Sequence, residues 1–172
     1  LMADAMRTET GAAIAITNGG GIRSGKVYPP GSTLTRRDMM AELPFRNTIA
    51  LLDISGRAIR AGLENGFSAL PRAAGRFPQV SGLKIVVDPS RPVGQRVISV
   101  MADGKPLEDT KIYKLATNDF IGKGGDGYAV FIDKPRIIDA NAASLMAHQV
   151  IDHIAAAGTV APAVEGRITR LD

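Results

Sequence analysis

The chain has 172 residues, of which 45% are hydrophobic and 22% are charged, and its formal net charge is +4. These values are typical of one globular domain with a hydrophobic core, and the apolar runs are too short to predict a membrane span. The basic residues are scattered, which argues against binding of nucleic acid, while the mild positive excess is compatible with an anionic ligand. The lack of cysteine excludes disulfides, thiolate zinc sites and cysteine nucleophiles.

The first quarter of the chain predicts a helix, a strand and a second helix. Residues 1–9 read as the end of a helix, and because residue 1 is not methionine we expect the chain to be a domain of a longer protein. An apolar strand over 12–17 leads into a glycine cluster at 18–25. Thr35 then begins a short helix, with Asp38 three residues later as a weak capping box.

The middle of the chain is rich in strands. Residues 47–54 predict a largely buried strand, and Ser55 can cap the amphipathic helix that follows. Residues 83–88 and 95–102 predict a pair of strands joined through a Pro- and Gly-containing turn, and 111–117 predict another strand.

The last third of the chain contains a glycine-rich loop at 118–128 and a helix over about 141–157 that ends at Gly158. His148 and His153 lie about 140° apart around this helix, so they do not share a face as two metal ligands would. Because helices and hairpins are mixed without regular βαβ repeats, the sequence predicts an α+β, or mixed α/β, fold in one domain.

The first glycine cluster resembles two phosphate-binding motifs but fits neither. Residues 20–26 spell G-x-x-x-x-G-K, yet Val27 stands where a P-loop needs Ser or Thr, and the Tyr-Pro-Pro that follows cannot begin the required helix. A dinucleotide fingerprint fails as well, because Ser24 replaces its third glycine.

What remains is a segment whose backbone can approach a ligand closely. Gly20 and its neighbours carry no side-chain bulk, and Asn18 and Arg23 stand at the edges of the cluster. The guanidinium of Arg23 can grip a phosphate with two hydrogen bonds. A tight structural turn with a solvated arginine explains the same residues equally well.

The second glycine loop offers an aromatic ring and an acid. Phe120 precedes four glycines and is suited to stacking on a flat base, while Asp126, next to Gly125, can accept hydrogen bonds from vicinal ribose hydroxyls. The alternatives are a core anchor for Phe120 and a turn residue for Asp126. A calcium loop is a poor alternative, because one aspartate supplies too few oxygen ligands. By itself, Phe45 in the segment 43–47 would be read as core packing.

Five motifs in one order resemble a known family, the 5'-nucleotidases of the UDP-sugar hydrolase and ecto-5'-nucleotidase type. The motifs are NGGGIRSG, LPFRN, FPQVSGL at 77–83, ATNDFIGKGGDGY and PAVEGRI at 162–168. Several motifs in order are more specific than any single one. The resemblance identifies residues 1–172 as the C-terminal, substrate-binding domain, and it implies a four-layer α/β/β/α arrangement with mixed sheets.

The resemblance also implies an activity for the whole protein. It would be a hydrolase that cleaves nucleoside 5'-monophosphates with two divalent metal ions on an N-terminal metallophosphoesterase domain, located in the periplasm or at the cell surface. This chain would then contain no catalytic residue, metal ligand or cofactor of its own, and it would bind nucleotide without turnover. The alternatives are a UDP-sugar hydrolase, a 2',3'-cyclic-nucleotide phosphodiesterase, and a non-catalytic nucleotide-binding or adhesion module.

The family's substrate contacts carry over to named positions of this chain. The resemblance implies that Phe45 and Phe120 sandwich the base, that Asp126 accepts the ribose hydroxyls and that Arg23 contacts the phosphate. It also makes Asn18 a polar contact to the nucleoside, with Gly20 and Gly125 in the surrounding loops. A further substrate-binding arginine of the family would lie before residue 1. Arg46 replaces a small residue of many relatives and is expected to point to solvent.

Overall fold

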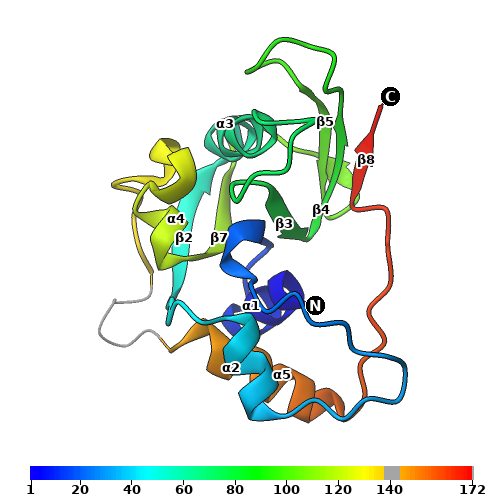
Figure 1. Cartoon of the computed structure of the whole chain (residues 1–172). Helices are drawn as coiled ribbons and strands as arrows, with labels where there is room; N and C mark the ends of the chain where they lie inside the picture. Colours follow the sequence, from blue (N-terminus) through cyan, green and yellow to red (C-terminus); the bar gives the residue numbers. More distant parts are fainter. Residues whose placement is uncertain (138–143, 172) are drawn as a thin grey trace.

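The computed structural model describes residues 1–137 and 144–171 and contains two four-stranded sheets flanked by helices (Figure 1). Each sheet has both parallel and antiparallel neighbours. In spatial order the first sheet comprises β2 (Ile49–Ser55), β7 (Ile112–Asn118), β1 (Ile14–Asn18) and β3 (Pro78–Ser81). The second comprises β6 (Lys105–Pro106), β5 (Val97–Ala102), β4 (Leu83–Val87) and β8 (Ile168–Arg170).

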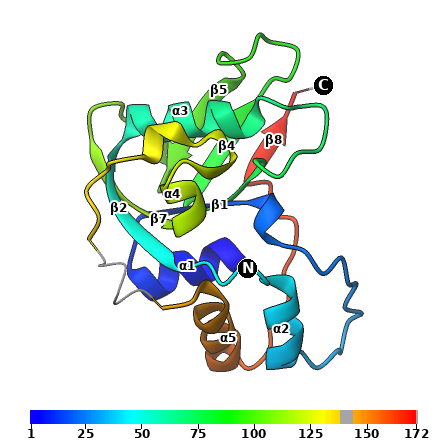
Figure 2. The ribbon, with the colours of Figure 1, turned by 60° about the vertical axis from the view of Figure 1, so that its left-hand side comes forward.

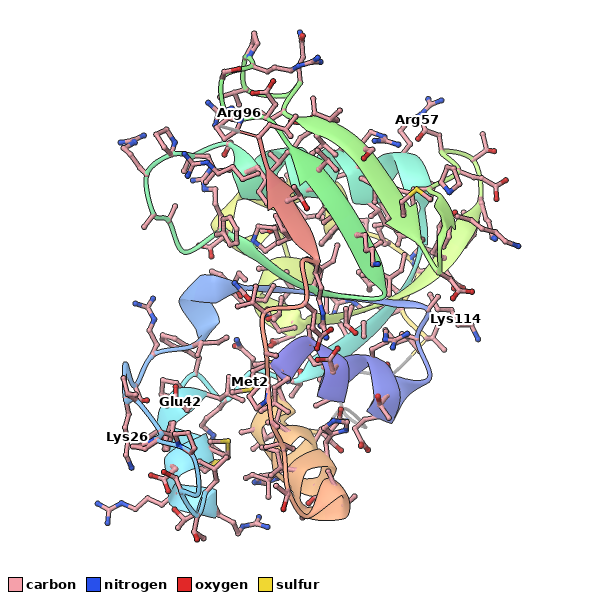
Figure 3. All side chains as sticks on the ribbon, turned by 90° about the vertical axis from the view of Figure 1, so that its right-hand side faces the viewer. Met2, Lys26, Glu42, Arg57, Arg96 and Lys114 are labelled. Carbon is pink, nitrogen blue, oxygen red and sulfur yellow. The ribbon has the colours of Figure 1, made fainter. Side chains whose placement is uncertain are left out.

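The helices lie on both faces of the first sheet, and one of them also contacts the second sheet. They are α1 (Met2–Thr10), α2 (Arg36–Glu42), α3 (Gly56–Phe67), α4 (Asp119–Gly122) and α5 (Met146–Ala157), with short 3₁₀ turns at Gly19–Gly21, Gly125–Gly127 and Ala129–Phe131. Figure 2 shows α1, α2 and α5 together beneath the first sheet. On the opposite side α3 contacts β2, β3 and β5, so it bridges the two sheets. The outer face of the second sheet is open in Figure 3.

β1 and β2 of the first sheet are buried on both faces, which explains their nearly continuous apolar sequences. Along β2, Leu52 and Ile54 enter a core shared with α3 and the second sheet, whereas Ile49 and Leu51 enter a core shared with α1, α2 and α5. This alternation is the two-residue period of a strand. The residues that the structure describes therefore form two hydrophobic cores, one on each face of the first sheet.

The expected fold class, mixed α/β with two mixed sheets, is confirmed. The five predicted strands lie within two residues of β1, β2, β4, β5 and β7, and β4 and β5 do form an antiparallel pair. The caps are also confirmed: the Ser55 hydroxyl accepts from the Ala58 amide, and Gly158 ends α5 with a positive φ. The last helix begins at Met146 rather than near 141, and residues 138–143 lie outside the described part of the chain.

Candidate functional site

The candidate site lies where two parallel strands of the first sheet end side by side. β1 and β7 are parallel neighbours, and they end at Asn18 and Asn118. In sheets with parallel strands, ligands bind preferentially at the carboxyl edge of the strands. Both asparagine side chains are buried, with exposed fractions of 3% and 0%. Polar groups buried at this edge need partners, and those partners connect the two glycine loops.

A chain of hydrogen bonds links the strand ends to Asp126. The Asn18 Nδ2 donates to Asp126 Oδ2 over 2.7 Å, and the Asn118 Nδ2 donates to Asn18 Oδ1 and to the Thr17 hydroxyl, each over 2.9 Å. The Asn118 Oδ1 accepts from the Ile121 amide over 2.9 Å and thereby caps α4. Both polar atoms of Asn18, expected to contact the nucleoside, thus have partners within the protein.

Asp126 sits at a left-handed turn of the second glycine loop, with φ 54° and ψ 20°. Its backbone carbonyl accepts from the Asn65 Nδ2 of α3 over 3.1 Å. The neighbouring Tyr128 is buried and donates its hydroxyl to the Arg76 carbonyl over 2.8 Å. Burial, helped by the negative charge of Asp126, raises the pKa of Tyr128, so this phenol stays a neutral donor. The loop is therefore tied to α3 and to the segment before β3.

Phe120 lies on α4 with 44% of its surface exposed, so it is not the core anchor that was one possible reading. Its ring stands directly over Gly125, because a Cβ built on Gly125 would come within 2.6 Å of the ring atoms Cε1, Cε2 and Cζ. The ring of Phe120 can occupy this position only because residue 125 has no side chain.

The first glycine loop approaches the same place through Gly75, a residue that the sequence analysis did not single out. The Gly20 amide donates to the Gly75 carbonyl over 2.8 Å, and a Cβ on Gly20 would lie 2.8 Å from the Gly75 Cα. A Cβ on Gly75 would in turn lie 3.4 Å from Asp126 Oδ2. The two glycine loops therefore meet across the segment before β3.

Arg23 is exposed and held at three points. Its amide donates to the Glu42 carbonyl over 3.0 Å, and its Nε donates to the Gly20 carbonyl over 2.6 Å. Its guanidinium carbon lies 5.3 Å from the ring centroid of Phe45, a cation–π contact. The first glycine loop and the LPFRN segment are thus joined by one side chain.

The loop from Arg23 to Thr35 is anchored on α2 by polar contacts (Figure 3). The buried carboxylate of Glu42 accepts hydrogen bonds from Ser24 and Tyr28, and Lys26 pairs with Asp38 over 2.7 Å. Hydrogen bonds from Lys26 and Thr35 lower the pKa of Asp38, which keeps this carboxyl charged. The expected capping box of Thr35 and Asp38 is confirmed.

Phe45 is 54% exposed, so neither of the two rings assigned to the base is buried. Thr48 and Asp119 remain paired just beyond the β2–β7 ladder, because the Thr48 amide donates to the side-chain Oδ1 of Asp119 over 3.1 Å and the Asp119 amide donates to the Thr48 carbonyl over 2.9 Å. These bonds bring together the segments that carry Phe45 and Phe120. A shared base between the rings remains a prediction. Arg46 is exposed, with φ 55°.

Within residues 1–137 and 144–171, no group of three or more His, Cys, Asp or Glu side chains is arranged to hold a metal ion. His153 instead faces Glu9 of α1, with 3.8 Å between Nδ1 and Oε1. No helix in this part of the chain is long and apolar enough to cross a membrane. A groove of about 740 Å³ lies between α1, β3 and residues 160–168, and none of the seven predicted site residues lines it.

The sequence and the fold both match known proteins. The family model described as 5'-nucleotidase, C-terminal domain, matches residues 1–133. The trifunctional nucleotide phosphoesterase protein YfkN of Bacillus subtilis is 39% identical over 128 residues, which cover 72% of this chain and 8% of that protein. The 5'-nucleotidase of Diplobatis ommata is 35% identical over 163 residues, or 90% of this chain and 28% of that protein.

Among solved structures, the 5'-nucleotidase precursor from Thermus thermophilus superimposes with a TM-score of 0.89 and is 36% identical, over 99% of this chain and 34% of that one. The NAD nucleotidase of Haemophilus influenzae has the same fold, with a TM-score of 0.84 at 23% identity. The chain thus spans about a third of the solved 5'-nucleotidase precursor and less of the two curated relatives.

Proposed function

This chain belongs to the 5'-nucleotidase family, whose C-terminal domain it represents, and from that premise we propose that it binds the nucleoside 5'-monophosphate that a two-domain hydrolase cleaves to nucleoside and phosphate. The observation that carries the proposal is that hydrogen bonds and close glycine contacts connect Asp126, Arg23 and two exposed rings to the loops at the carboxyl edge of β1 and β7. In this arrangement an acceptor, a cation and two flat apolar surfaces match the sugar, the phosphate and the base.

Each part of the ligand has one chemically suited group. The carboxylate of Asp126 can only accept hydrogen bonds, so it suits the two ribose hydroxyls and would repel a phosphate. Arg23 has only donors and a positive charge, and its Nη atoms suit the phosphate. Phe45 and Phe120 would stack on the base, and Gly20 and Gly125 keep the loops free of side chains beside it. For Asn18 we propose support of Asp126 besides the expected nucleoside contact.

The chemistry itself is assigned to the other domain. The two divalent metals that the family resemblance implies would lie on an N-terminal metallophosphoesterase domain, and the described residues of this chain do not gather a metal-ligand set. The role of this chain would be to orient the phosphate for attack. Relatives that include a snake venom 5'-nucleotidase of Gloydius brevicauda, 37% identical over 164 residues, support a periplasmic or extracellular location.

The test is to measure kcat/KM for AMP and 2'-dAMP with the protein that carries both domains. Asp126→Ala is expected to lower kcat/KM for AMP much more than for dAMP, whereas Arg23→Ala should lower both equally. Loss of one charge-assisted hydrogen bond costs about 1.5–3 kcal/mol, or roughly ten- to a hundredfold. Equal losses for both substrates in Asp126→Ala would refute the ribose role.

Two matched controls are available for this experiment. Asp103 is an exposed aspartate with φ 49°, so Asp103→Ala repeats the backbone change of Asp126→Ala outside the site. Arg46→Ala removes an exposed arginine next to Phe45 and is expected to leave kcat/KM unchanged if Arg46 faces solvent.

A second candidate is a broader phosphoesterase activity that includes cyclic nucleotides or UDP-sugars. It is favoured by the trifunctional nucleotide phosphoesterase among the relatives. Hydrolysis rates for AMP, 2',3'-cyclic AMP and UDP-glucose, measured side by side, distinguish the two candidates, because only the broader enzyme would process all three at comparable rates.

A further inference from the structure

Asn118 is a fully buried residue behind the candidate site, and its hydrogen bonds have a direction that the backbone imposes. Its Oδ1 accepts from the Ile121 amide, a donor that cannot be reversed. The Asn118 Nδ2 must therefore face the other way, toward the Thr17 hydroxyl and Asn18 Oδ1. The orientation of a side-chain amide is defined by such a network of partners.

The same logic determines the orientation of Asn18. Because its Oδ1 accepts from Asn118, its Nδ2 points at Asp126 Oδ2, which is an acceptor only. A reversed Asn18 would place one carbonyl oxygen against the carboxylate and one amino group against another amino group. The path of hydrogen bonds thus runs from the Ile121 amide through Asn118 and Asn18 to the Asp126 carboxylate. A donor faces an acceptor at each step.

We propose that Asn118 is a positioning residue for ribose recognition: it sets the orientation of the Asn18 amide, which in turn holds the Asp126 carboxylate for the sugar hydroxyls. This inference rests on the proposed function of Asp126. Asn118 also caps α4, the helix that carries Phe120, so the same buried side chain supports both the sugar-binding and the base-stacking groups. One oxygen of Asp126 is held by Asn18, which leaves the other for the ligand.

Two substitutions separate the link to Asn18 from the helix cap. Asn118→Asp keeps the size and the capping oxygen but replaces the donor, so Asn18 is expected to turn its Nδ2 toward the new carboxylate and its oxygen toward Asp126. Asn118→Ser also keeps a capping oxygen but is too short to reach Asn18. Thr117→Val is the matched control, because the Thr117 hydroxyl makes a buried bond to the Ile16 carbonyl on the same strands without contacting this network.

The measurement is the dissociation constant for adenosine and for 2'-deoxyadenosine, determined by calorimetry with the folded wild-type and variant proteins. Wild type should prefer adenosine, and Asp126→Ala should remove the preference. Both Asn118 variants should lower the preference by about fivefold, and Thr117→Val should leave it unchanged even if it lowers thermal stability. In an Asp126→Ala background, Asn118→Asp should change the preference no further.

The outcomes separate the proposed function from the positioning role. A wild-type protein that binds neither nucleoside, or a preference that survives Asp126→Ala, overturns the ribose part of the proposed function together with this inference. A preference that depends on Asp126 but is intact in both Asn118 variants overturns the positioning role alone. Equal weakening of both nucleosides by the Asn118 variants does so too, since that result indicates a purely structural residue.

Discussion

Gly125 is the residue on which the exposed position of Phe120 depends. A Cβ at this position would lie 2.6 Å from three ring atoms, so Gly125→Ala should push the ring aside. Base stacking on an aromatic ring contributes about 1–3 kcal/mol, and we expect adenosine affinity to fall by up to about a hundredfold. The measurement is calorimetric titration with adenosine.

The matched control for Gly125→Ala is Gly122→Ala, at the end of the helix α4 that carries Phe120. A Cβ at Gly122 would meet its nearest neighbour, the Thr117 Cγ2, at 3.5 Å, which is ordinary van der Waals contact. This variant should bind adenosine as wild type does. If Gly125→Ala also binds normally, Phe120 does not stack on the base in the position described.

At the level of single residues, the sequence was sufficient to select positions but not their partners. Asn18 and Asp126 were both identified from local patterns, yet they are 108 residues apart, and their hydrogen bond arises only because β1 and β7 are neighbours. Gly75 and Asn118 were not selected, because nothing in their local sequence distinguishes them from ordinary loop and strand residues. Their roles depend on contacts between distant segments.

Among the secondary-structure elements, α1 is connected by an ion pair to Arg167, the residue just before β8. Both Nη atoms of Arg167 reach the carboxylate of Asp4, over 2.7 and 3.0 Å, and Nη1 also donates to the Val80 carbonyl of β3. Burial alone would raise the pKa of Asp4, but the hydrogen bonds from Arg167 and Ser81 outweigh it and hold this pKa well below its usual range. The folded state thus favours the charged carboxylate.

The pair should therefore make stability depend on pH. A carboxyl group with a depressed pKa in the folded state contributes stability above its unfolded pKa of about 4, and this contribution is lost as the pH falls further. Arg167→Met should destabilise the protein at pH 7, and its difference from wild type should shrink below about pH 4. Urea unfolding at both pH values measures this, and a constant difference would argue that Arg167 acts through packing alone.

The prediction of whole elements succeeded where the sequence pattern was long. The five recognised strands each have at least five residues with a clear apolar pattern, whereas β3, β6 and β8, with four, two and three residues, were missed. Such short strands are defined by the ladders they join rather than by their own composition. The helix α4 was also read as loop, because its four residues are too few to show a helical period. Its cap, Asn118, is the last residue of the strand β7.

At the scale of the whole molecule, the two hydrophobic cores should unfold together because they share the first sheet. Leu63 of one core and Met6 of the other are both fully buried. Leu63→Ala and Met6→Ala should each lower stability by about 2–5 kcal/mol and shift one common transition. Val164→Ala, at a fully exposed position, should have no effect. Calorimetry that resolves two transitions would contradict this prediction.

The chain as a whole is expected to bind nucleotide without hydrolysing it. This expectation rests on the proposal that the two metals lie on an N-terminal domain, and within the described residues no group of three or more His, Cys, Asp or Glu side chains is arranged to hold a metal ion. The measurement is phosphate release from AMP by the purified 172-residue chain with added Mg²⁺, Mn²⁺ or Zn²⁺. Metal-dependent release that persists through further purification would show that this division of labour is wrong.

Under the proposed roles of Arg23 and Phe45, the guanidinium over the ring would couple the binding energies of the phosphate and the base of a nucleotide. One face of the ring is already occupied by the cation, so a base could use only the other face, and the ring would be less constrained without Arg23. Arg23→Ala would then change the affinity even for a free base or a nucleoside, which has no phosphate. The binding free energies of nucleoside and of phosphate, measured separately, are then not expected to add up to that of the intact nucleotide. The difference measures how strongly Arg23 couples the two parts of the ligand.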